Sequence, residues 1–183
     1  MSIYEQLEKE YALKKELMNK GETVDKLDLM FKGYALDAVD TAKRNFKIEL
    51  DFSEDSIEKV EKILDVLNKT MKRDNPPKDL VLSFAKQFSG YMGQVMLIKW
   101  SGEWKDENEY SIKNGPGLRV KGQDLFLLSK VYRRITNGAD DNVWHFYQVI
   151  KSEIDGTKNI NEVQIEELRV KEKKSWIKRI LGR

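Results

Sequence analysis

The sequence predicts an α+β fold in which several helices pack on a small, mostly antiparallel sheet. Three observations support this. Apolar residues recur at helical spacing over four long segments of the first hundred residues. A period-two stretch follows the second of these segments, and short apolar runs separated by glycines fill residues 101–129. Because the long helical patterns and the short strand patterns occupy different parts of the chain, we expect separate helical and sheet regions.

The first and third helical patterns carry recognisable start or stop signals. Ser2 and Glu5 match a capping box, so the first helix is expected to begin there and to end before Gly21. Residues 24–44 form the second predicted helix, and the small alanines on its apolar face indicate close approach to a neighbouring helix. The third places five apolar side chains on one stripe between residues 57 and 71, and a pair of prolines ends it.

A fourth helix is predicted over residues 79–98, and its wide apolar face indicates the most buried helix of the domain. Gly90 and Gly93 lie inside it, and each costs about 1 kcal/mol relative to alanine in a helix. We therefore expect tight packing against both glycines. Residues 46–52 alternate apolar and charged side chains, which predicts a half-buried strand with its apolar side inward.

The second half of the chain predicts a small meander followed by two helices. The expected strands are residues 102–104, 110–112, 118–120 and 125–128. A short helix should follow over residues 130–136, closed by Asn137-Gly138. Asp140 and Asp141 can cap a last helix that begins near Val143.

Length and composition suggest how these elements are organised. A chain of 183 residues with 40% apolar and 35% charged side chains can bury one core and should expose charged helix faces. We expect residues 1–155 to form a single α+β domain, of which residues 1–45 are an N-terminal helical part. Residues 156–183 are expected to form a polar linker and a basic, amphipathic tail.

Composition also excludes several classes of chemistry. The chain has no cysteine, which rules out disulfides, thiol nucleophiles and cysteine-ligated metals, and its one histidine is His145. Phosphate-binding glycine motifs are missing, and pairs such as Asp25 with Asp28 are interpreted as solvated helix faces. No cofactor or metal is therefore expected. A net charge of +2 argues against nucleic acid as a partner. The charged N-terminus and the lack of a long apolar stretch suggest a cytoplasmic protein.

Aromatic and arginine side chains in the second half suit recognition of an anion, a nucleotide or a protein. The candidate binding residues are Trp100, Trp104, Arg119, Tyr132, Arg133, Arg134 and His145. The alternative is that the tryptophans seal the core while the arginines are solvated. No serine or cysteine nucleophile is marked beside His145, so no catalytic residue is assigned.

The C-terminal tail has the strongest local pattern, with one apolar face flanked by basic residues. Its candidate interaction residues are Lys173, Lys174, Trp176, Ile177, Lys178, Arg179, Ile180 and Leu181. This pattern suits packing on its own domain or on a second copy, docking into a partner protein, or weak binding to an anionic membrane surface.

Three further segments carry a resemblance to known sequences. They are Trp100-Ser101-Gly102-Glu103-Trp104, Gly115-Pro116-Gly117-Leu118-Arg119-Val120, and residues 129–138 followed by Asp141 and Phe146-Tyr147. Through them, residues 52–154 resemble a family of uncharacterised bacterial proteins known as a domain of unknown function. The resemblance implies a compact bacterial α+β domain and no activity to inherit.

The function expected from the sequence is a non-catalytic protein-interaction module of an immunity-like or regulatory kind, with an unidentified protein as partner. One alternative is a protein or enzyme that binds a small ligand or anion in a pocket near Trp104, Arg119, Tyr132 and Arg133. Another is a peripheral membrane protein that binds through its tail. The absence of a catalytic constellation favours a non-enzymatic role.

Overall fold

The computed structural model describes residues 1–106, 108 and 115–156. The chain divides into two compact units, Met1–Trp144 and His145–Arg183, and residues 145–156 are the described part of the second. The fold is α+β, as predicted. The α-helices are α1 (Ile3–Asn19), α2 (Lys26–Thr41), α3 (Ser56–Asp74), α4 (Lys78–Trp100), α5 (Leu127–Asn137) and α6 (Val143–Asp155). None of these described helices has the length and apolar character that crossing a membrane requires.

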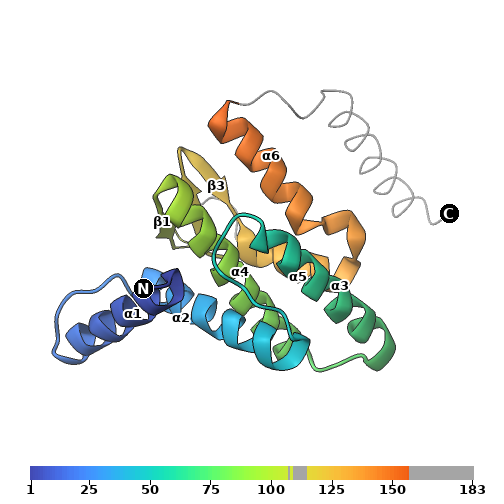
Figure 1. The fold of residues 1–183 in the computed structure, drawn as a ribbon, viewed down its shortest axis with the longest axis horizontal. Helices are drawn as coiled ribbons and strands as arrows, with labels where there is room; N and C mark the ends of the chain where they lie inside the picture. The colour runs from blue at the N-terminus through green and yellow to red at the C-terminus, as the bar shows by residue number, and fades with distance from the viewer. Residues whose placement is uncertain (107, 109–114, 157–183) are drawn as a thin grey trace. The chain divides into compact units, whose positions relative to one another are not determined.

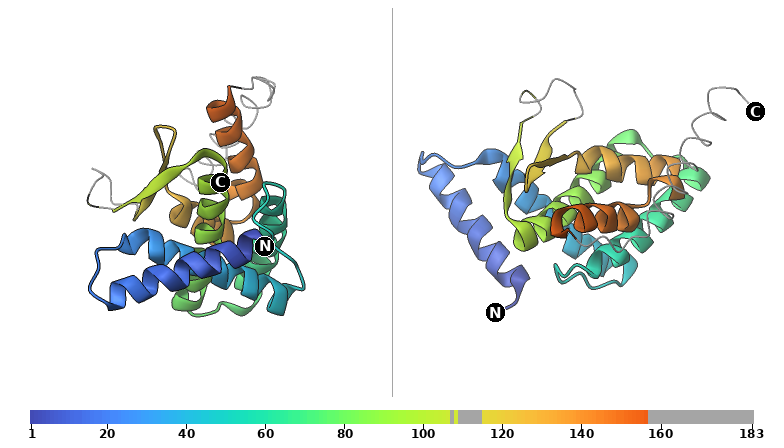
Figure 2. Two further views of the ribbon diagram at one scale, coloured as in Figure 1. Left: turned by 60° about the vertical axis from the view of Figure 1, so that its left-hand side comes forward. Right: turned by 90° about the horizontal axis from the view of Figure 1, so that it is seen from above.

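The first two helices begin at side-chain caps. Ser2 and Glu5 form the predicted capping box, with Ser2 Oγ accepting from Glu5 N at 3.2 Å and Glu5 Oε2 accepting from Ser2 N at 2.8 Å. Helix α2 begins after Asp25, whose Oδ1 accepts from the backbone N–H groups of Leu27 and Asp28, both at 3.0 Å. Helix α1, dark blue in Figure 2, connects through a loop to α2 and packs on it.

Helix α4 is the centre of the first unit, and it contacts α2, α3, α5 and the sheet. Helices α2 and α4 lie side by side (Figure 1). Their backbones approach closely at Gly90, where a Cβ atom would lie 2.7 Å from the carbonyl oxygen of Phe31. At Gly93 a Cβ atom would lie 2.3 Å from Cζ2 of Trp104. The predicted tight packing at both glycines is confirmed, and it explains why glycine occupies two positions inside a helix.

The strand predicted over residues 46–52 is wrong. Helix α2 continues into one π-helical turn, η1 (Ala42–Phe46), and Lys47 then adopts a left-handed conformation with φ 59°. Beyond it the predicted alternation of burial survives, because Leu50 and Phe52 are buried while their neighbours are exposed. No strand within the described residues pairs with this segment.

Side chains replace a neighbouring strand as hydrogen-bond partners of this segment. The backbone N–H of Phe52 donates to Tyr91 Oη at 2.7 Å, and Lys59 Nζ donates to the carbonyl oxygen of Glu49 at 3.0 Å. A period-two pattern reports alternating burial in an extended chain, and it contains no information about strand pairing. The sequence therefore predicted correctly which side chains face inward, but it did not predict that the segment has no neighbouring strand to pair with.

The sheet contains β1 (Gly102–Lys105), β2 (Gly117–Val120) and β3 (Gln123–Leu125), antiparallel and in that order. Residues 102–104 and 118–120 were correctly predicted as strands, whereas the strand predicted over residues 110–112 lies outside the described residues. Lys121 and Gly122, with φ 48° and 81°, form the two-residue turn between β2 and β3. Positive φ at both central positions is typical of the type I′ turns that suit strand twist.

The strand predicted over residues 125–128 is also wrong, since β3 ends at Leu125 and α5 begins at Leu127. Leu127, Val131 and Ile135 are all buried, and their spacing of four residues places them on one face of α5. A short apolar run fits a strand and a buried helix turn equally well, which explains the error. The short turn η3 (Ala139–Asp141) separates α5 from α6.

Candidate functional site

An open cleft of about 340 Å³ lies in the first unit, between α1, the start of α2, the second half of α4 and the start of β1. Its wall is mainly polar. The polar and aromatic residues that line it are Lys14, Asp25, Asp28, Lys32, Gln94, Ser101, Glu103 and Trp104. These residues come from distant parts of the sequence, and the packing of α1 on α2 and of α2 on α4 and β1 brings them together.

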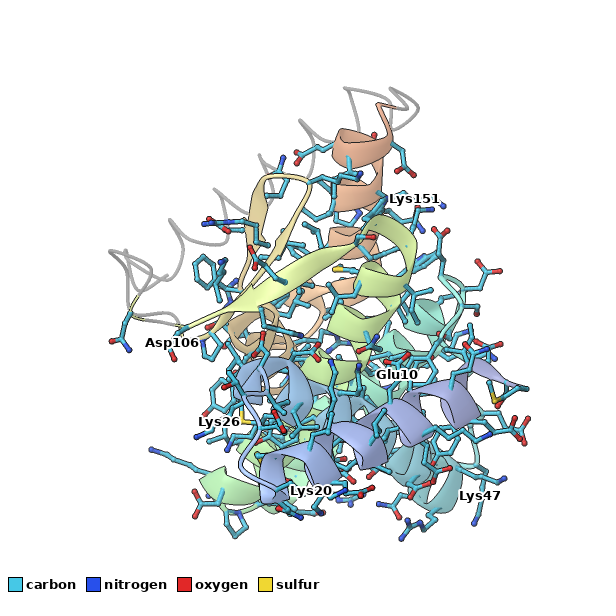
Figure 3. The ribbon with its side chains drawn as sticks, turned by 90° about the vertical axis from the view of Figure 1, so that its left-hand side faces the viewer. Glu10, Lys20, Lys26, Lys47, Asp106 and Lys151 are labelled. Carbon is cyan, nitrogen blue, oxygen red and sulfur yellow. The ribbon has the colours of Figure 1, made fainter. Side chains whose placement is uncertain are left out.

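Two lysines and two carboxylates form an ionic network along one wall of the cleft. Lys14 Nζ lies 2.6 Å from Asp28 Oδ2, and Lys32 Nζ lies 2.8 Å from Glu10 Oε2 and 3.7 Å from Asp28 Oδ2. Lys32 is 5% exposed, so its ammonium depends on these counterions. The hydrogen bond to Asp28 raises the pKa of Lys14 above its ordinary value. Figure 3 labels Glu10 on α1.

The N-terminus of α2 also reaches the cleft, but its own cap occupies it. The first turn of a helix attracts anions through its free N–H groups and its dipole. Here Asp25 Oδ1 already accepts from Leu27 N and Asp28 N. The carboxylate supplies the negative charge that this end favours, so the cleft offers carboxylate oxygens at a position where an uncapped helix would offer N–H donors.

Two nearly buried residues of the cleft have polar side-chain groups that make no hydrogen bond to any described residue. Gln94 is 8% exposed and Trp104 is 5% exposed, and both line the cleft. Within the described part of the chain, no hydrogen bond uses the amide of Gln94 or the indole N–H of Trp104. Neither group is fully sealed from solvent. The cleft is therefore where these groups can meet a partner, and native proteins rarely leave such groups unused.

Trp104 is held rigidly in place. Its ring stacks on Phe31 of α2, with centroids 3.6 Å apart and planes 7° apart, and its edge lies against Gly93 of α4. A substituent at position 93 would collide with the indole, so glycine there makes room for the ring. Because α2 and α4 both fix the ring, its N–H is a preorganised donor and not a mobile one.

Backbone strain also occurs at the cleft wall. Ser101 joins α4 to β1 with φ 57° and ψ 154°, a region that glycine populates almost exclusively and that costs other residues about 1–3 kcal/mol. Gly102 follows, and a Cβ atom there would lie 2.2 Å from the carbonyl oxygen of Arg119 on β2. Strain of this kind accumulates at binding sites, where the surrounding structure holds the backbone in an unfavourable shape.

Of the residues predicted to bind, Trp104 lines the cleft, and the structure does not bring Arg119 to it. Residues directly opposite on neighbouring strands share a face, and successive residues alternate. Trp104 lies opposite Leu118, whereas Arg119 lies opposite Glu103. The two side chains thus project from opposite faces of the sheet. Arg119 forms a two-pronged pair with Asp124, at 2.7 and 2.9 Å.

The other predicted residues occupy separate places. Trp100 is buried at the end of α4, beneath Lys99, whose Nζ lies 5.4 Å from the ring centroid. Tyr132, Arg133 and Arg134 all lie on α5, and none of them lines the cleft. Arg133 is exposed and Arg134 is buried, so their side chains face different surroundings. His145 lies on α6 in the second unit. The tail residues 173–181 fall outside the described residues.

Most residues of the cleft were not predicted from the sequence. Asp25 and Asp28 were interpreted as part of a solvated helix face, yet the side chain of Asp28 is 21% exposed and contacts two lysines. Lys32 lies directly beside Phe31, on the buried side of α2, and a lysine in that place is a sequence signal for a buried charge. Gln94 gives a similar signal inside the apolar run of α4. Among the described residues, no three metal-ligating side chains gather into a group.

The apolar side chains that remain exposed do not favour a competing site in this part of the chain. They are Met1 ahead of α1, Leu13 and Leu17 on α1, Met30 on α2, Val66 on α3, and Leu80 and Ile98 on α4. Interaction surfaces are contiguous apolar patches of several hundred Å². These side chains are spread over four helices, so the interaction module expected from the sequence stays a prediction.

No protein-family model, curated protein or solved structure matches this chain. The resemblance of residues 52–154 to an uncharacterised bacterial family therefore stays a prediction as well. Any functional conclusion has to come from the geometry and chemistry of the cleft.

Proposed function

We propose that this protein binds a small polar molecule in the cleft between α1, α2, α4 and β1, and that it does not transform it. The observation that carries the proposal is Gln94, a residue that is nearly buried and lines the cleft, and whose amide has no hydrogen-bond partner in the described part of the chain. The amide keeps some contact with solvent, so a ligand group that hydrogen-bonds to it would replace that solvent, and such a hydrogen bond contributes about 0.5–1.5 kcal/mol net.

Three further features support a binding site. The indole N–H of Trp104 is a second donor without a described partner, and Phe31 holds its ring in one orientation. Ser101 stores backbone strain at the wall. The volume of about 340 Å³ falls within the range of small-molecule sites. Binding without reaction is favoured because the lysines of the cleft are ion-paired, and the hydroxyl of Ser101 has neither histidine nor cysteine beside it in the lining.

The experiment is a thermal-shift screen of polar metabolites against the full chain, followed by calorimetry on compounds that raise the melting temperature. Gln94→Met removes the amide while nearly preserving side-chain volume. Gln6→Met is the matched control, because Gln6 is exposed on α1 and does not line the cleft. We expect at least one compound that binds the wild type and Gln6→Met equally and binds Gln94→Met at least tenfold more weakly.

Two results would contradict the proposal. One is a screen in which no compound stabilises the wild type. The other is a set of compounds that all bind Gln94→Met and Trp104→Phe as tightly as the wild type, which would place their site elsewhere.

A further inference from the structure

We infer that the ligand of this cleft is a short extended peptide, whose backbone amides pair with the outer edge of β1. This inference rests on the proposed function and adds the chemical class of the ligand. It depends on the hydrogen-bonding register of the sheet, on the way β1 borders the cleft, and on the amide of Gln94.

The turn between β2 and β3 determines which backbone groups of the sheet face one another. Val120 and Gln123 are paired and flank a two-residue turn with the positive φ values of type I′. The residues that flank such a turn exchange backbone hydrogen bonds, and bonded and non-bonded pairs then alternate along the ladder. The N–H and C=O of Arg119 therefore point away from β3, toward Glu103, which lies opposite on β1.

The same alternation directs the backbone groups of two β1 residues away from the sheet. Because Glu103 faces β2, the N–H and C=O groups of Gly102 and Trp104 face the other way. The sheet has the order β1-β2-β3, so β1 is an edge strand with no strand on that side in the described chain. No described residue bonds to these outward groups. A row of this kind is a template for the backbone of another chain.

This edge of β1 borders the cleft. Ser101, Gly102, Glu103 and Trp104 all line it. The ring of Trp104 packs between α2 and α4, whereas the side chain of Glu103 projects from the opposite face of the sheet. Side chains on opposite faces do not point into the same cleft, so what these consecutive residues share in the lining is the backbone of the strand edge.

Gln94 supplies a matching group from α4. Its amide can both donate and accept a hydrogen bond, as can each peptide group of a ligand. The residue is 8% exposed, and its amide has no partner among the described residues. The indole N–H of Trp104 can donate but not accept, so it suits a peptide carbonyl oxygen. Backbone edge and side chains thus require the same chemical group.

The charged side chains of the cleft do not select a charged ligand. Lys14 is bonded to Asp28 at 2.6 Å, and Lys32 lies between Glu10 and Asp28. The carboxylate of Asp25 caps α2 and accepts from its first N–H groups. A neutral peptide group leaves all of these pairs in place, whereas a charged ligand would compete with them.

The strand geometry also sets the length of the ligand. Gly102 and Trp104 are two residues apart, which corresponds to about 7 Å along a strand. An extended peptide of about three residues spans this distance and presents alternate residues to β1. The cleft volume of about 340 Å³ suits a ligand of this size and is too small for a long strand of a partner protein. Main-chain hydrogen bonds supply the affinity in this mode of recognition.

The test is an NMR titration of the full-length protein with N-acetylated tripeptide amides whose middle residue is alanine, serine, asparagine or leucine. We expect at least one of them to bind. At saturation, it should slow hydrogen exchange of the backbone amides of Gly102 and Trp104 about tenfold, because bonded amides exchange only on opening. The amide of Glu103 faces β2 and should not change.

N-methylated peptides provide the second arm, because each methyl group removes one peptide N–H. Alternate N–H groups of a strand face the same neighbour, so the middle residue and its two neighbours should respond oppositely. Methylation should weaken binding about tenfold at one of these two sets and leave it nearly unchanged at the other. Gln94→Met should also weaken binding, whereas the control Gln6→Met should not.

The failures are distinguishable. Equal weakening by all three methyl groups would overturn pairing with a strand. Protection of Asp124 in place of Gly102 and Trp104 would place the peptide on the edge of β3 and also overturn the inference. The peptide class fails, and the binding function stands, if no tripeptide binds while a compound from the screen binds in a Gln94-dependent way. If no compound of any class binds, both fail.

Discussion

Phe31 and Trp104 stack face to face, with ring centroids 3.6 Å apart and planes 7° apart, and this contact joins α2 to β1 at the cleft. The third partner is Gly93 of α4, which lies against the edge of the indole. Three elements, α2, α4 and β1, thus meet at one side chain. Substitutions around this ring should therefore affect the cleft and the stability of the fold together.

Gly93→Ala should destabilise the protein by up to about 2 kcal/mol. The new Cβ atom would lie 2.3 Å from Cζ2 of Trp104, and the stacking of the indole on Phe31 opposes a shift of the ring away from it. Overpacking of this kind costs about 1–3 kcal/mol, against which alanine gains about 1 kcal/mol in helix propensity. Gly33→Ala is the control, because its Cβ atom would contact the side chain of Tyr11 at 3.1 Å, and it should be neutral or slightly stabilising. Urea unfolding of both variants measures the difference.

Ser101→Gly should stabilise the protein by about 1 kcal/mol. Glycine adopts φ 57° and ψ 154° without strain, and the relief of about 1–3 kcal/mol exceeds the extra chain entropy that glycine adds to the unfolded state. Ser101→Ala separates this effect from loss of the hydroxyl, since alanine keeps the strain. Equal melting temperatures for the glycine and alanine variants would show that the backbone at this position is not strained.

Arg134→Met should destabilise the protein by about 3–5 kcal/mol. Arg134 is 2% exposed and bonds Glu61 at 2.7 Å and Asp65 at 3.1 Å, so its loss leaves the nearly buried carboxylate of Glu61 without its cation. The double variant Arg134→Met with Glu61→Gln should recover most of the loss. Glutamine removes the charge and keeps an acceptor for the backbone N–H of Val143, which Glu61 now binds at 2.8 Å.

The double-mutant cycle also tests the cost of this arginine. Its Nη1 is buried without a hydrogen bond in the described part of the chain, which lowers the net benefit of the ion pair. Denaturant midpoints measured for the single and double variants give the coupling energy. Additive losses in the cycle would mean that Glu61 and Arg134 do not stabilise each other.

Tyr91→Phe should cost about 1–3 kcal/mol at neutral pH, and this cost should shrink above pH 10. Tyr91 Oη accepts from Phe52 N at 2.7 Å and lies 2.6 Å from Ser56 Oγ, so phenylalanine leaves a buried N–H without an acceptor. Burial raises the pKa of Tyr91 well above its ordinary value of 10.0.

The sign of the pH effect follows from proton binding. Above pH 10 the unfolded chain releases the Tyr91 proton while the folded protein keeps it, so the free energy of unfolding falls as pH rises. Phenylalanine has no proton to lose, and its variant lacks this decline. Melting temperatures of both proteins between pH 8 and 11 should therefore converge. A constant difference across that range would contradict the raised pKa.

The sequence predicted the fold well where the signal is local. The capping box at Ser2, the buried character of α4 and the close packing at its two glycines depend on neighbouring residues or on one helix face. The strand predicted over residues 46–52 failed because pairing requires a second strand that no local pattern reports. The run at residues 125–128 failed because a short apolar run fits a strand and a buried helix turn equally well, and here β3 ends at Leu125.

The cleft was harder to predict because its chemistry is not local. Trp104 was identified as a candidate from its residue type alone. Lys14 and Asp28 are 14 positions apart and meet through the packing of α1 on α2, while Gln94 comes from a third helix. Arg119 and Trp104 were grouped because arginines and aromatic side chains together suit recognition, and the alternation of side chains along the strands separates them. The sequence did contain one signal for the cleft, namely a polar residue inside an apolar helix face, such as Gln94 on α4.

The bond from Phe52 to Tyr91 has a consequence for amide exchange. Protected amides usually mark helices and strands, yet here a loop amide is tied to a buried phenol contributed by the most central helix. Exchange of the Phe52 proton requires either local withdrawal of the segment from α4 or opening of the core around it. Its rate should thus follow that of the slowest amides of α4, so that a residue outside any regular element reports the global opening of the protein.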